Sequence, residues 1–475
     1  MLTESELTAE IRAGLEAVTP PAPWLAGGVE KRLRASHQHR RMFPTPPALR
    51  LGLNVIALIV LITLAVTAVG VFIALHRPTV PVRPGSGPVI FPTKMISATT
   101  GWALVGTSEL WRTTDGGLSW TDVSSPHLAD RVVNADLNYF LDGNRAWITE
   151  QGGGRPGSPA YYWVTFRTVD GGLTWQRGDP LAATLPQLQS GSAQQYFIDA
   201  DTGWLLFSGR DPSQTTWPAL YGTRDGGQHW TLITSKAGSG ASSGTAIPCS
   251  GSMTFMSAAT GWMSLGFCEQ TPSQNQTTAP GLRWVRDIFV VTHDGGSTWQ
   301  VQTLEINPAA DSRFDAPVFF DQLHGIMVVR GSHPTLLATS DGGSTWSART
   351  LPGESQTDVD FVDPKHGWAV AGPSSMFTKT KDNSQRIISL PLYHTDDGGL
   401  TWTPVRTNVR LESPVGVVLS NFSFVDQTTG FGTLFTLAAG PSEFLKTTDG
   451  GRTWLVVRVC KKGLGNSYPP PACPS

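Results

Sequence analysis

One octapeptide recurs seven times in this 475-residue chain, and the repetition restricts the fold more than any other feature. Every copy has the pattern Thr-x-Asp-Gly-Gly-x-x-Trp, as in Thr113 to Trp120. Successive aspartates are separated by 55, 55, 69, 47, 56 and 52 residues, which is about the length of four short strands with their loops. The aspartates are Asp115, Asp170, Asp225, Asp294, Asp341, Asp397 and Asp449.

A second motif has the same period, because Gly-Trp or a close variant precedes every octapeptide. Its copies are Gly101-Trp102, Ala146-Trp147, Gly203-Trp204, Gly261-Trp262, Gly325-Ile326, Gly367-Trp368 and Gly430-Phe431. Each repeat is therefore predicted to contain four antiparallel strands, with the octapeptide between the third and the fourth. The 51 Gly, 35 Pro and low charged fraction of 15% suit many short strands. We expect an all-β fold, a closed seven-bladed β-propeller over residues 89–475.

The octapeptide has the chemistry of a tight turn. The Asp side chain can accept hydrogen bonds from nearby backbone N–H groups, and Gly tolerates positive φ. A calcium loop needs several carboxylates at alternating positions, whereas each copy supplies one, apart from the doublet Asp396-Asp397. We therefore expect the seven aspartates to be structural, and we expect no metal site and no cofactor.

The repeated octapeptide resembles the Asp-box, also called the bacterial neuraminidase repeat. Together with the Gly-Trp turns, the pattern looks most like the photosystem II assembly-factor-like propellers. Sialidases, xyloglucan hydrolases and sortilin-type receptors also carry Asp-boxes, so the resemblance implies architecture more strongly than activity. The Arg-Ile-Pro motif of sialidases does not occur here. We assign no catalytic residue and expect no enzyme activity, although paired carboxylates of a glycosidase are harder to exclude.

An apolar stretch precedes the repeats. Residues 51–75 contain no charge and exceed the roughly 20 residues that span a bilayer as a helix. A cleaved signal peptide would be shorter and closer to the start of the chain. Six Lys and Arg precede the stretch closely and two follow it, which predicts an inside N-terminus. We expect a cytoplasmic basic tail over 1–50, one transmembrane helix over 51–75, a Pro-rich linker over 76–88, and a propeller outside the cytoplasm.

Two groups of residues are candidates for binding. The first is the position three residues before each octapeptide Asp, which is basic in four contiguous blades of the closed ring. These residues are Arg112, Arg167, His394 and Lys446, and an arc of them would suit an acidic partner segment or an anionic glycan. The alternative is that these side chains cover neighbouring blades and pair with carboxylates.

The second group accompanies long loops between the second and third strands, around 150–160, 209–218, 269–282 and 373–386. Insertions on one face of a repeat protein often build its binding surface. The aromatic residues beside these loops are Trp163, Trp217 and Trp284. Packing at strand ends is the alternative role for each of them.

The four cysteines are expected to form two disulfides in an oxidising compartment. Cys249 and Cys268 flank a predicted hairpin whose turn is centred near Ala259, so they should lie nearly opposite each other. Cys460 and Cys473 could pin the C-terminus in the same way. The alternative is four free thiols.

These features favour a membrane-anchored scaffold that binds a protein or peptide. The formal net charge of -2 provides no basic field for nucleic acid. The alternatives are a membrane-tethered glycoside hydrolase and a receptor that signals through its cytoplasmic tail. The sequence does not identify the ligand or the oligomeric state.

Overall fold

The computed structural model describes residues 80–81, 90–105, 109–125, 137–152, 162–182, 191–209, 218–234, 247–270, 282–304, 306, 311–353, 357–371, 387–389, 391–412, 417–436, 440–457 and 460–462. Within these ranges no helix has the length and apolar character needed to cross a bilayer. The predicted tail 1–50 and the predicted span 51–75 lie outside them, so both stay predictions.

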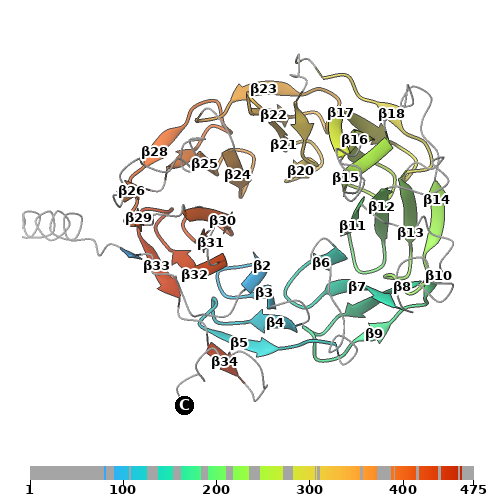
Figure 1. The fold of residues 1–475 in the computed structure, drawn as a ribbon, viewed down its shortest axis with the longest axis horizontal. Coiled ribbons are helices and arrows are strands. Elements are labelled where there is room, and N and C mark those ends of the chain that lie inside the picture. The colour runs from blue at the N-terminus through green and yellow to red at the C-terminus, as the bar shows by residue number, and fades with distance from the viewer. Residues whose placement is uncertain are drawn as a thin grey trace, which may run out of the picture. The chain divides into compact units, whose positions relative to one another are not determined.

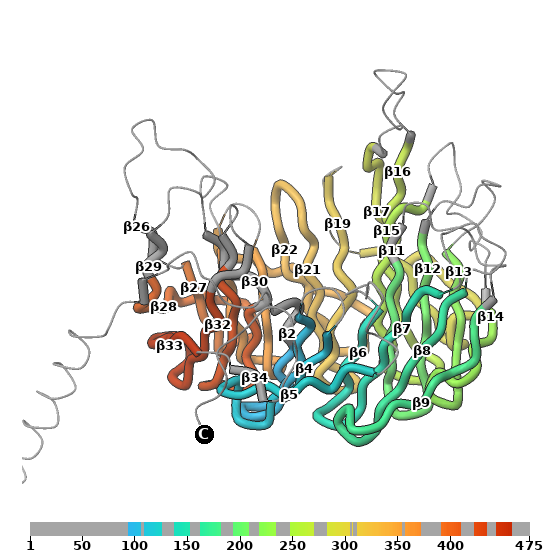
Figure 2. The backbone as a smooth tube through the Cα atoms, turned by 60° about the horizontal axis from the view of Figure 1, so that its bottom comes forward, coloured from blue at the N-terminus to red at the C-terminus, as the bar shows by residue number. Residues whose placement is uncertain are grey.

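The described strands form seven antiparallel sheets around a ring, and the predicted all-β seven-bladed propeller is confirmed (Figure 1). We number the sheets as blades I to VII in chain order. In each blade the strands follow chain order from the centre outward. Figure 2 shows the strands running between the two faces of the ring.

Blades I to IV have the following strands. Blade I contains β2 (Ile90–Met95), β3 (Gly101–Val105), β4 (Glu109–Thr113) and β5 (Ser119–Asp122); blade II contains β6 (Asn138–Phe140), β7 (Ala146–Gly152), β8 (Tyr162–Thr168), β9 (Gln176–Arg177) and β10 (Leu181–Ala182). Blade III contains β11 (Gly191–Phe197), β12 (Gly203–Gly209), β13 (Ala219–Thr223) and β14 (Thr231–Thr234); blade IV contains β15 (Ile247–Phe255), β16 (Gly261–Gln270), β17 (Leu282–Thr292) and β18 (Gln300–Val301).

The other three blades repeat the pattern. Blade V contains β19 (Arg313–Phe314), β20 (Val318–Phe319), β21 (Gly325–Arg330), β22 (Thr335–Thr339) and β23 (Ser347–Thr350). Blade VI contains β24 (Thr357–Phe361), β25 (Gly367–Ala371), β27 (Leu392–Thr395) and β28 (Thr403–Val405); blade VII contains β30 (Val417–Phe424), β31 (Gly430–Thr436), β32 (Gly440–Thr447) and β33 (Trp454–Val457). A separate small sheet joins β1 (Val80–Pro81), β29 (Val409–Glu412) and β26 (Ile387–Ser389).

Each octapeptide closes the hairpin between the two outer strands of its blade. In blade VI, the Thr395 hydroxyl donates to Asp397 Oδ1 at 2.8 Å, and the Thr401 N–H donates to the same oxygen at 2.9 Å. The Gly399 N–H donates to Thr395 Oγ1 at 2.8 Å. Equivalent bonds occur in all seven copies. Both glycines have positive φ, 75° and 90° in this copy, which explains the Gly-Gly pair.

The contacts between consecutive blades, which we call seams, contain the Gly-Trp tryptophans. Trp204 of blade III stacks on Phe255 of blade IV with ring centroids 3.6 Å apart. Its indole N–H donates to the carbonyl oxygen of Gly295, in the octapeptide of blade IV, at 3.0 Å. Trp102, Trp147, Trp262 and Trp368 stack in the same way on a phenylalanine of the following blade. The repeated motif therefore joins neighbouring blades.

The ring closes between blades VII and I without exchange of a blade strand. Phe444 of blade VII packs against Trp120 of blade I, with ring centroids 6.2 Å apart. The chain then adds β34 (Cys460–Lys462) in parallel to β5, the outermost strand of blade I. The chain's last described strand thus returns to its first blade.

Within blade IV, Cys249 and Cys268 form a disulfide with Cα atoms 5.7 Å apart. The register pairs Cys268 with Ile247, and an irregularity between Pro248 and Ser250 brings Cys249 beside it. The side chain of Cys460 and the whole of Cys473 lie outside the described residues, so that pairing stays a prediction.

Candidate functional site

The predicted basic arc lies along seams of the ring. Arg112 Nε donates to the carbonyl oxygen of Gly143 in blade II at 2.8 Å, and its guanidinium lies over the Trp102 ring. Lys446 Nζ donates to the carbonyl oxygen of Ala98 in blade I at 3.1 Å. Each contact joins the third strand of one blade to the turn between the first two strands of the next. These bonds fit the packing role that the sequence left open, while a partner-binding role stays a prediction.

The other two residues of the arc occupy the same kind of position. Arg167 NH1 donates to the carbonyl oxygen of Asp225 at 3.2 Å and lies 3.6 Å from Asp201 Oδ1. The His394 ring lies 4.9 Å from Trp368, and burial, the main cause, lowers the pKa of this imidazole. Arg112, Arg167 and Lys446 therefore sit in three separate seams, whereas His394 packs against the Gly-Trp tryptophan of its own blade.

The aromatic candidates differ in their surroundings. Trp163 is 2% exposed and packs on Phe207 across the seam between blades II and III. Trp217 lies outside the described residues. Trp284 is partly exposed, and the guanidinium of Arg313 lies 4.3 Å from its ring centroid. Of the three, Trp284 belongs to the charged site described next.

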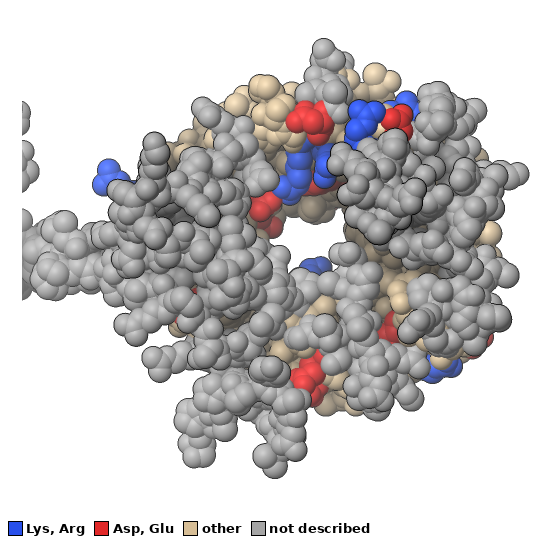
Figure 3. All heavy atoms as spheres, in the orientation of Figure 1, with Lys and Arg blue, Asp and Glu red and all other residues tan. Residues whose placement is uncertain are grey.

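A charged network lies at the inner rim of blades IV, V and VI, at the end of the blades that carries the long loops. Arg330, the last residue of β21, forms ion pairs with Asp315 and Asp358, each at 2.8 Å. Arg313 is the register partner of Arg330 across β19 and β21. Figure 3 shows basic and acidic side chains gathered beside the central opening. We call Trp284, Asp287, Arg313, Asp315, Arg330 and Asp358 the charged rim.

Asp287 links blade IV to blade V within this rim. Its Oδ2 accepts a hydrogen bond from the Phe314 N–H at 2.8 Å. Burial, the main cause, raises the pKa of Asp287 to about 7, and the Phe314 hydrogen bond and Arg313 oppose the shift. Burial also raises the pKa of Asp315, while Arg330 opposes that shift. Near neutral pH the rim thus holds one carboxyl that is partly protonated, Asp287, and two that are paired with Arg330.

Arg313 presents the most accessible cation of the rim. Its side chain is exposed and its guanidinium plane rests on Trp284. Stacking on an aromatic face restricts an Arg side chain while leaving its N–H groups able to donate. Such an arrangement recognises carboxylate or other planar anionic groups at a small entropic cost.

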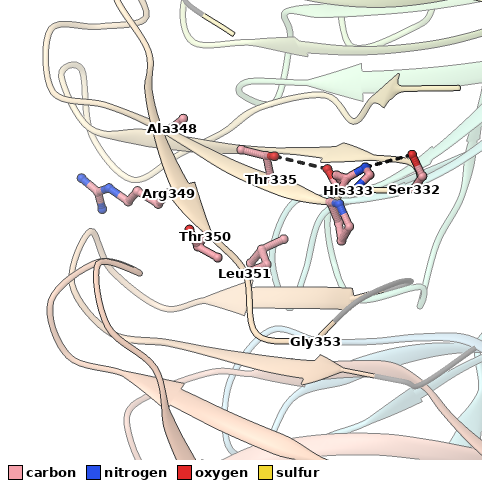
Figure 4. Close-up of a pocket in the computed structure, with 9 residues that line it drawn as sticks. Ser332, His333, Thr335, Ala348, Arg349, Thr350, Leu351 and Gly353 are labelled. Atoms are coloured by element: carbon pink, nitrogen blue, oxygen red, sulfur yellow. Dashed lines mark hydrogen bonds between the residues drawn. The ribbon is translucent and has the colours of Figure 1, made fainter. Parts of the chain in front are cut away.

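A separate cavity of about 750 Å³ lies at the open end of the β22–β23 hairpin (Figure 4). Ser332, His333 and Thr335 form one side, and Thr350, Leu351 and Gly353 form another. The Ser332 hydroxyl lies 3.2 Å from His333 Nδ1 and 3.2 Å from Asp311 Oδ1. These bonds hold the exposed turn after β21, and the imidazole does not bridge the serine and the carboxylate as a catalytic triad requires.

No group of three or more His, Cys, Asp or Glu suited to a metal ion occurs within the described part of the chain. The carboxylates of the octapeptides are instead occupied by hydrogen bonds of their own turns. For Asp397 the hydroxyl of Thr401, followed by the Thr401 N–H, lowers the pKa to about 2. These aspartates are charged turn acceptors at neutral pH.

Comparison with known proteins finds structural neighbours at low sequence identity. No protein-family model matches the chain, and no curated protein matches it. Among solved structures, YCF48 bound to D1 peptide is 18% identical with a TM-score of 0.44, covering 79% of this chain and 99% of that one. YCF48 from Cyanidioschyzon merolae is 18% identical with a TM-score of 0.46, covering 76% and 95%. A GH74 xyloglucanase from Xanthomonas campestris is 13% identical with a TM-score of 0.41, covering 80% and 68%.

Sequence reasoning selected Trp284 but missed Asp287, Arg313, Asp315, Arg330 and Asp358. These residues come from three blades, and no repeated motif marks them. What these residues share is a position near the long-loop end of a blade. That position can be recognised only when the strand register is known.

Proposed function

We propose that the protein is a membrane-anchored propeller outside the cytoplasm that binds a protein or peptide partner as an assembly or interaction scaffold. The observation that carries the proposal is the charged rim, where Arg313 stacks on Trp284 beside the Arg330 ion pairs. An aromatic residue supporting an arginine is typical of residues that dominate protein interfaces. A partner with an acidic segment suits this arrangement.

The proposed membrane anchor rests on the uncharged stretch 51–75 and on the basic residues before it. Protease treatment of sealed vesicles tests this orientation. In sealed vesicles whose cytoplasmic face points inward, a tag placed before residue 51 should be protected from added protease. The propeller should be digested or labelled from outside. Protection of both ends would contradict the topology.

The binding role is tested by crosslinking the full-length chain in membranes and identifying the captured protein. Arg313→Ala should reduce capture about tenfold or more, because it removes the stacked guanidinium. Arg177→Ala, at an exposed position on β9, is the matched control and should leave capture unchanged. Equal capture by wild type and Arg313→Ala would place the binding site elsewhere.

A membrane-tethered glycoside hydrolase is the second candidate, and the raised pKa of Asp287 favours it. A carboxyl with a pKa of about 7 can act as a general acid near neutral pH. A screen of glycosides against the full-length chain tests this candidate, with Asp287→Asn as the variant. Turnover that disappears in Asp287→Asn would replace the scaffold proposal with the enzyme.

A further inference from the structure

The innermost strands present one side chain per blade at an equivalent position. This position pairs in register with the Gly-Trp tryptophan or its substitute, so its side chain points toward the following blade. We call these residues the inner ring: Lys94, Tyr139, Tyr196, Thr254, Val318, Asp360 and Ser423. They border the opening through the molecule, which Figure 3 shows plainly.

Lys94 is the only amine of the inner ring. Its side chain is exposed to water, while Nζ donates to the carbonyl oxygen of Phe140 in blade II at 2.9 Å. Nζ also lies 5.3 Å from the ring centroid of Tyr139. The amine is therefore reachable from the opening and held in one place by the neighbouring blade.

Tyr139 and Tyr196 are the inner-ring residues of blades II and III. The Tyr139 and Tyr196 rings lie 5.1 Å apart, and their side chains are hydrogen-bonded to each other. Burial, the main cause, raises the pKa of both residues, so both are neutral at physiological pH, and one of their two hydroxyl protons is donated within the pair. An amine and two neutral phenols thus occupy equivalent positions on the innermost strands of blades I to III.

The protein around the amine also disfavours its charged form. Burial lowers the pKa of Lys94, although part of the residue is exposed. A larger neutral fraction makes a lysine a better nucleophile toward carbonyl carbon.

We propose that Lys94 captures small carbonyl compounds that enter the central opening, with the remaining free hydroxyl of the Tyr139–Tyr196 pair as a neighbouring hydrogen-bond donor. The amine nitrogen bonds to the carbonyl carbon, and the carbon–oxygen π electrons move to oxygen, which takes a proton. Loss of this oxygen as water leaves an imine between Lys94 and the compound. The amine's two protons leave in that water, so no oxidant or reductant takes part.

The test uses pyridoxal as the probe on the full-length chain in detergent at pH 7, with cyanoborohydride added to reduce any imine to a stable amine. Peptide mass spectrometry then gives the labelling rate of each lysine. Lys446 is the internal control, because it also donates to a carbonyl of the next blade, at 3.1 Å, and lies 5.2 Å from the Phe431 ring. It belongs to β32, the third strand from the centre, and not to the inner ring.

Lys94 should be labelled about threefold or more faster than Lys446, because Lys94 is exposed while Lys446 is half-buried and because the pKa of Lys94 is lowered. Tyr196→Phe should slow Lys94 labelling and leave Lys446 labelling unchanged. Lys94→Arg should remove the label from this peptide alone. Labelling of Lys94 no faster than that of Lys446 in the wild-type chain would overturn the proposal. This comparison is made within one folded molecule and does not depend on the partner-binding role.

Discussion

At the residue scale, the seams depend on a few large aromatic side chains. Trp102, Trp147, Trp204 and Trp368 are fully buried, and each also donates its indole N–H to a backbone carbonyl of the following blade. A buried Trp with a satisfied N–H contributes a large apolar area without the penalty of an unpaired donor. The ring should therefore be most sensitive to substitution at these positions.

Trp204→Ala is expected to lower the free energy of unfolding by about 3–5 kcal/mol, because it leaves a cavity against Phe255. Chemical denaturation followed by tryptophan fluorescence and circular dichroism measures the change. Leu232→Ala is the control, since this side chain is 49% exposed and its loss should cost less than about 0.5 kcal/mol. Equal losses of unfolding free energy in Trp204→Ala and Leu232→Ala would contradict the idea that packing at the seam stabilises the ring.

Asp360, at the seam between blades VI and VII, makes the stability of the fold depend on pH. Its Oδ2 accepts the Phe424 N–H at 2.5 Å, and burial raises its pKa to about 7 from an ordinary value of 3.8. Between these two values the unfolded carboxyl is ionised while the folded one keeps its proton. The folded state then binds more protons, so this group makes stability fall as pH rises from about 4 to 7.

Asp360→Asn should remove this contribution, because the amide oxygen can still accept the Phe424 N–H without a charge. The variant should match wild type near pH 4 and exceed it by a few kcal/mol at pH 8, on the order of the shift in pKa. Urea unfolding at several pH values measures the difference. Asp311→Asn, at an exposed position, is the control variant. A stability difference between Asp360→Asn and wild type that does not grow with pH would contradict the raised pKa of Asp360.

At the element scale, local hydrogen bonds among the Thr, Asp and Gly residues of each octapeptide shape its turn, and the N–H of its first glycine donates to the turn between the first two strands of the same blade. The same Thr hydroxyl, Asp carboxylate and Gly-Gly pair recur in all seven copies, so each outer hairpin forms from its own sequence. The second glycine also allows a close approach between blades. A Cβ at Gly451 would meet the Leu392 side chain of blade VI at 2.5 Å, in addition to the strain of φ +89°.

The doublet in blade VI provides a matched test of this turn. Asp397→Ala should lower the free energy of unfolding by about 1–2 kcal/mol, because it removes the acceptor of the Thr395 and Thr401 hydrogen bonds. The neighbouring Asp396 is exposed, and Asp396→Ala should change stability by less than about 0.5 kcal/mol. Thermal unfolding of both variants measures this. A larger effect at position 396 would be incompatible with the assigned turn.

At the scale of the whole molecule, the described strands close into a ring by packing and by one added strand. Blade VII is complete in itself, and β34 then pairs with the outer edge of blade I. An added strand covers unpaired backbone groups of β5 that would otherwise be an open sheet edge. The final strand should therefore stabilise the closure between the first and last blades.

Truncation after Val457 is expected to lower the Tm by about 2 °C or more, because it removes the backbone hydrogen bonds between β34 and β5. The matched control is truncation after Lys462, which keeps β34 and removes only the following residues. Differential scanning calorimetry compares the two. A Tm lowered equally by both truncations would assign the effect to the tail and not to β34.

The repeated motifs determined the architecture because their information is local. A turn that requires Gly at positive φ, and a Trp at a constant distance from it, can be recognised without knowing what lies beside them in space. Residue spacing also placed Cys249 and Cys268 on facing strands, and the number of repeats determined the number of blades.

Only the tertiary structure decided which side chains meet across blades. The basic positions before the octapeptides form one series in the sequence, yet in space Arg112, Arg167 and Lys446 occupy separate seams, because each contacts the blade that follows it. Conversely, Asp287, Arg313 and Arg330 share no motif, and they gather because Arg313 and Arg330 are register partners in blade V while Asp287 of blade IV bonds to the Phe314 N–H next to Arg313. Repetition along the chain specifies each blade, whereas the chemistry of the rim depends on the register and on the closure of the ring.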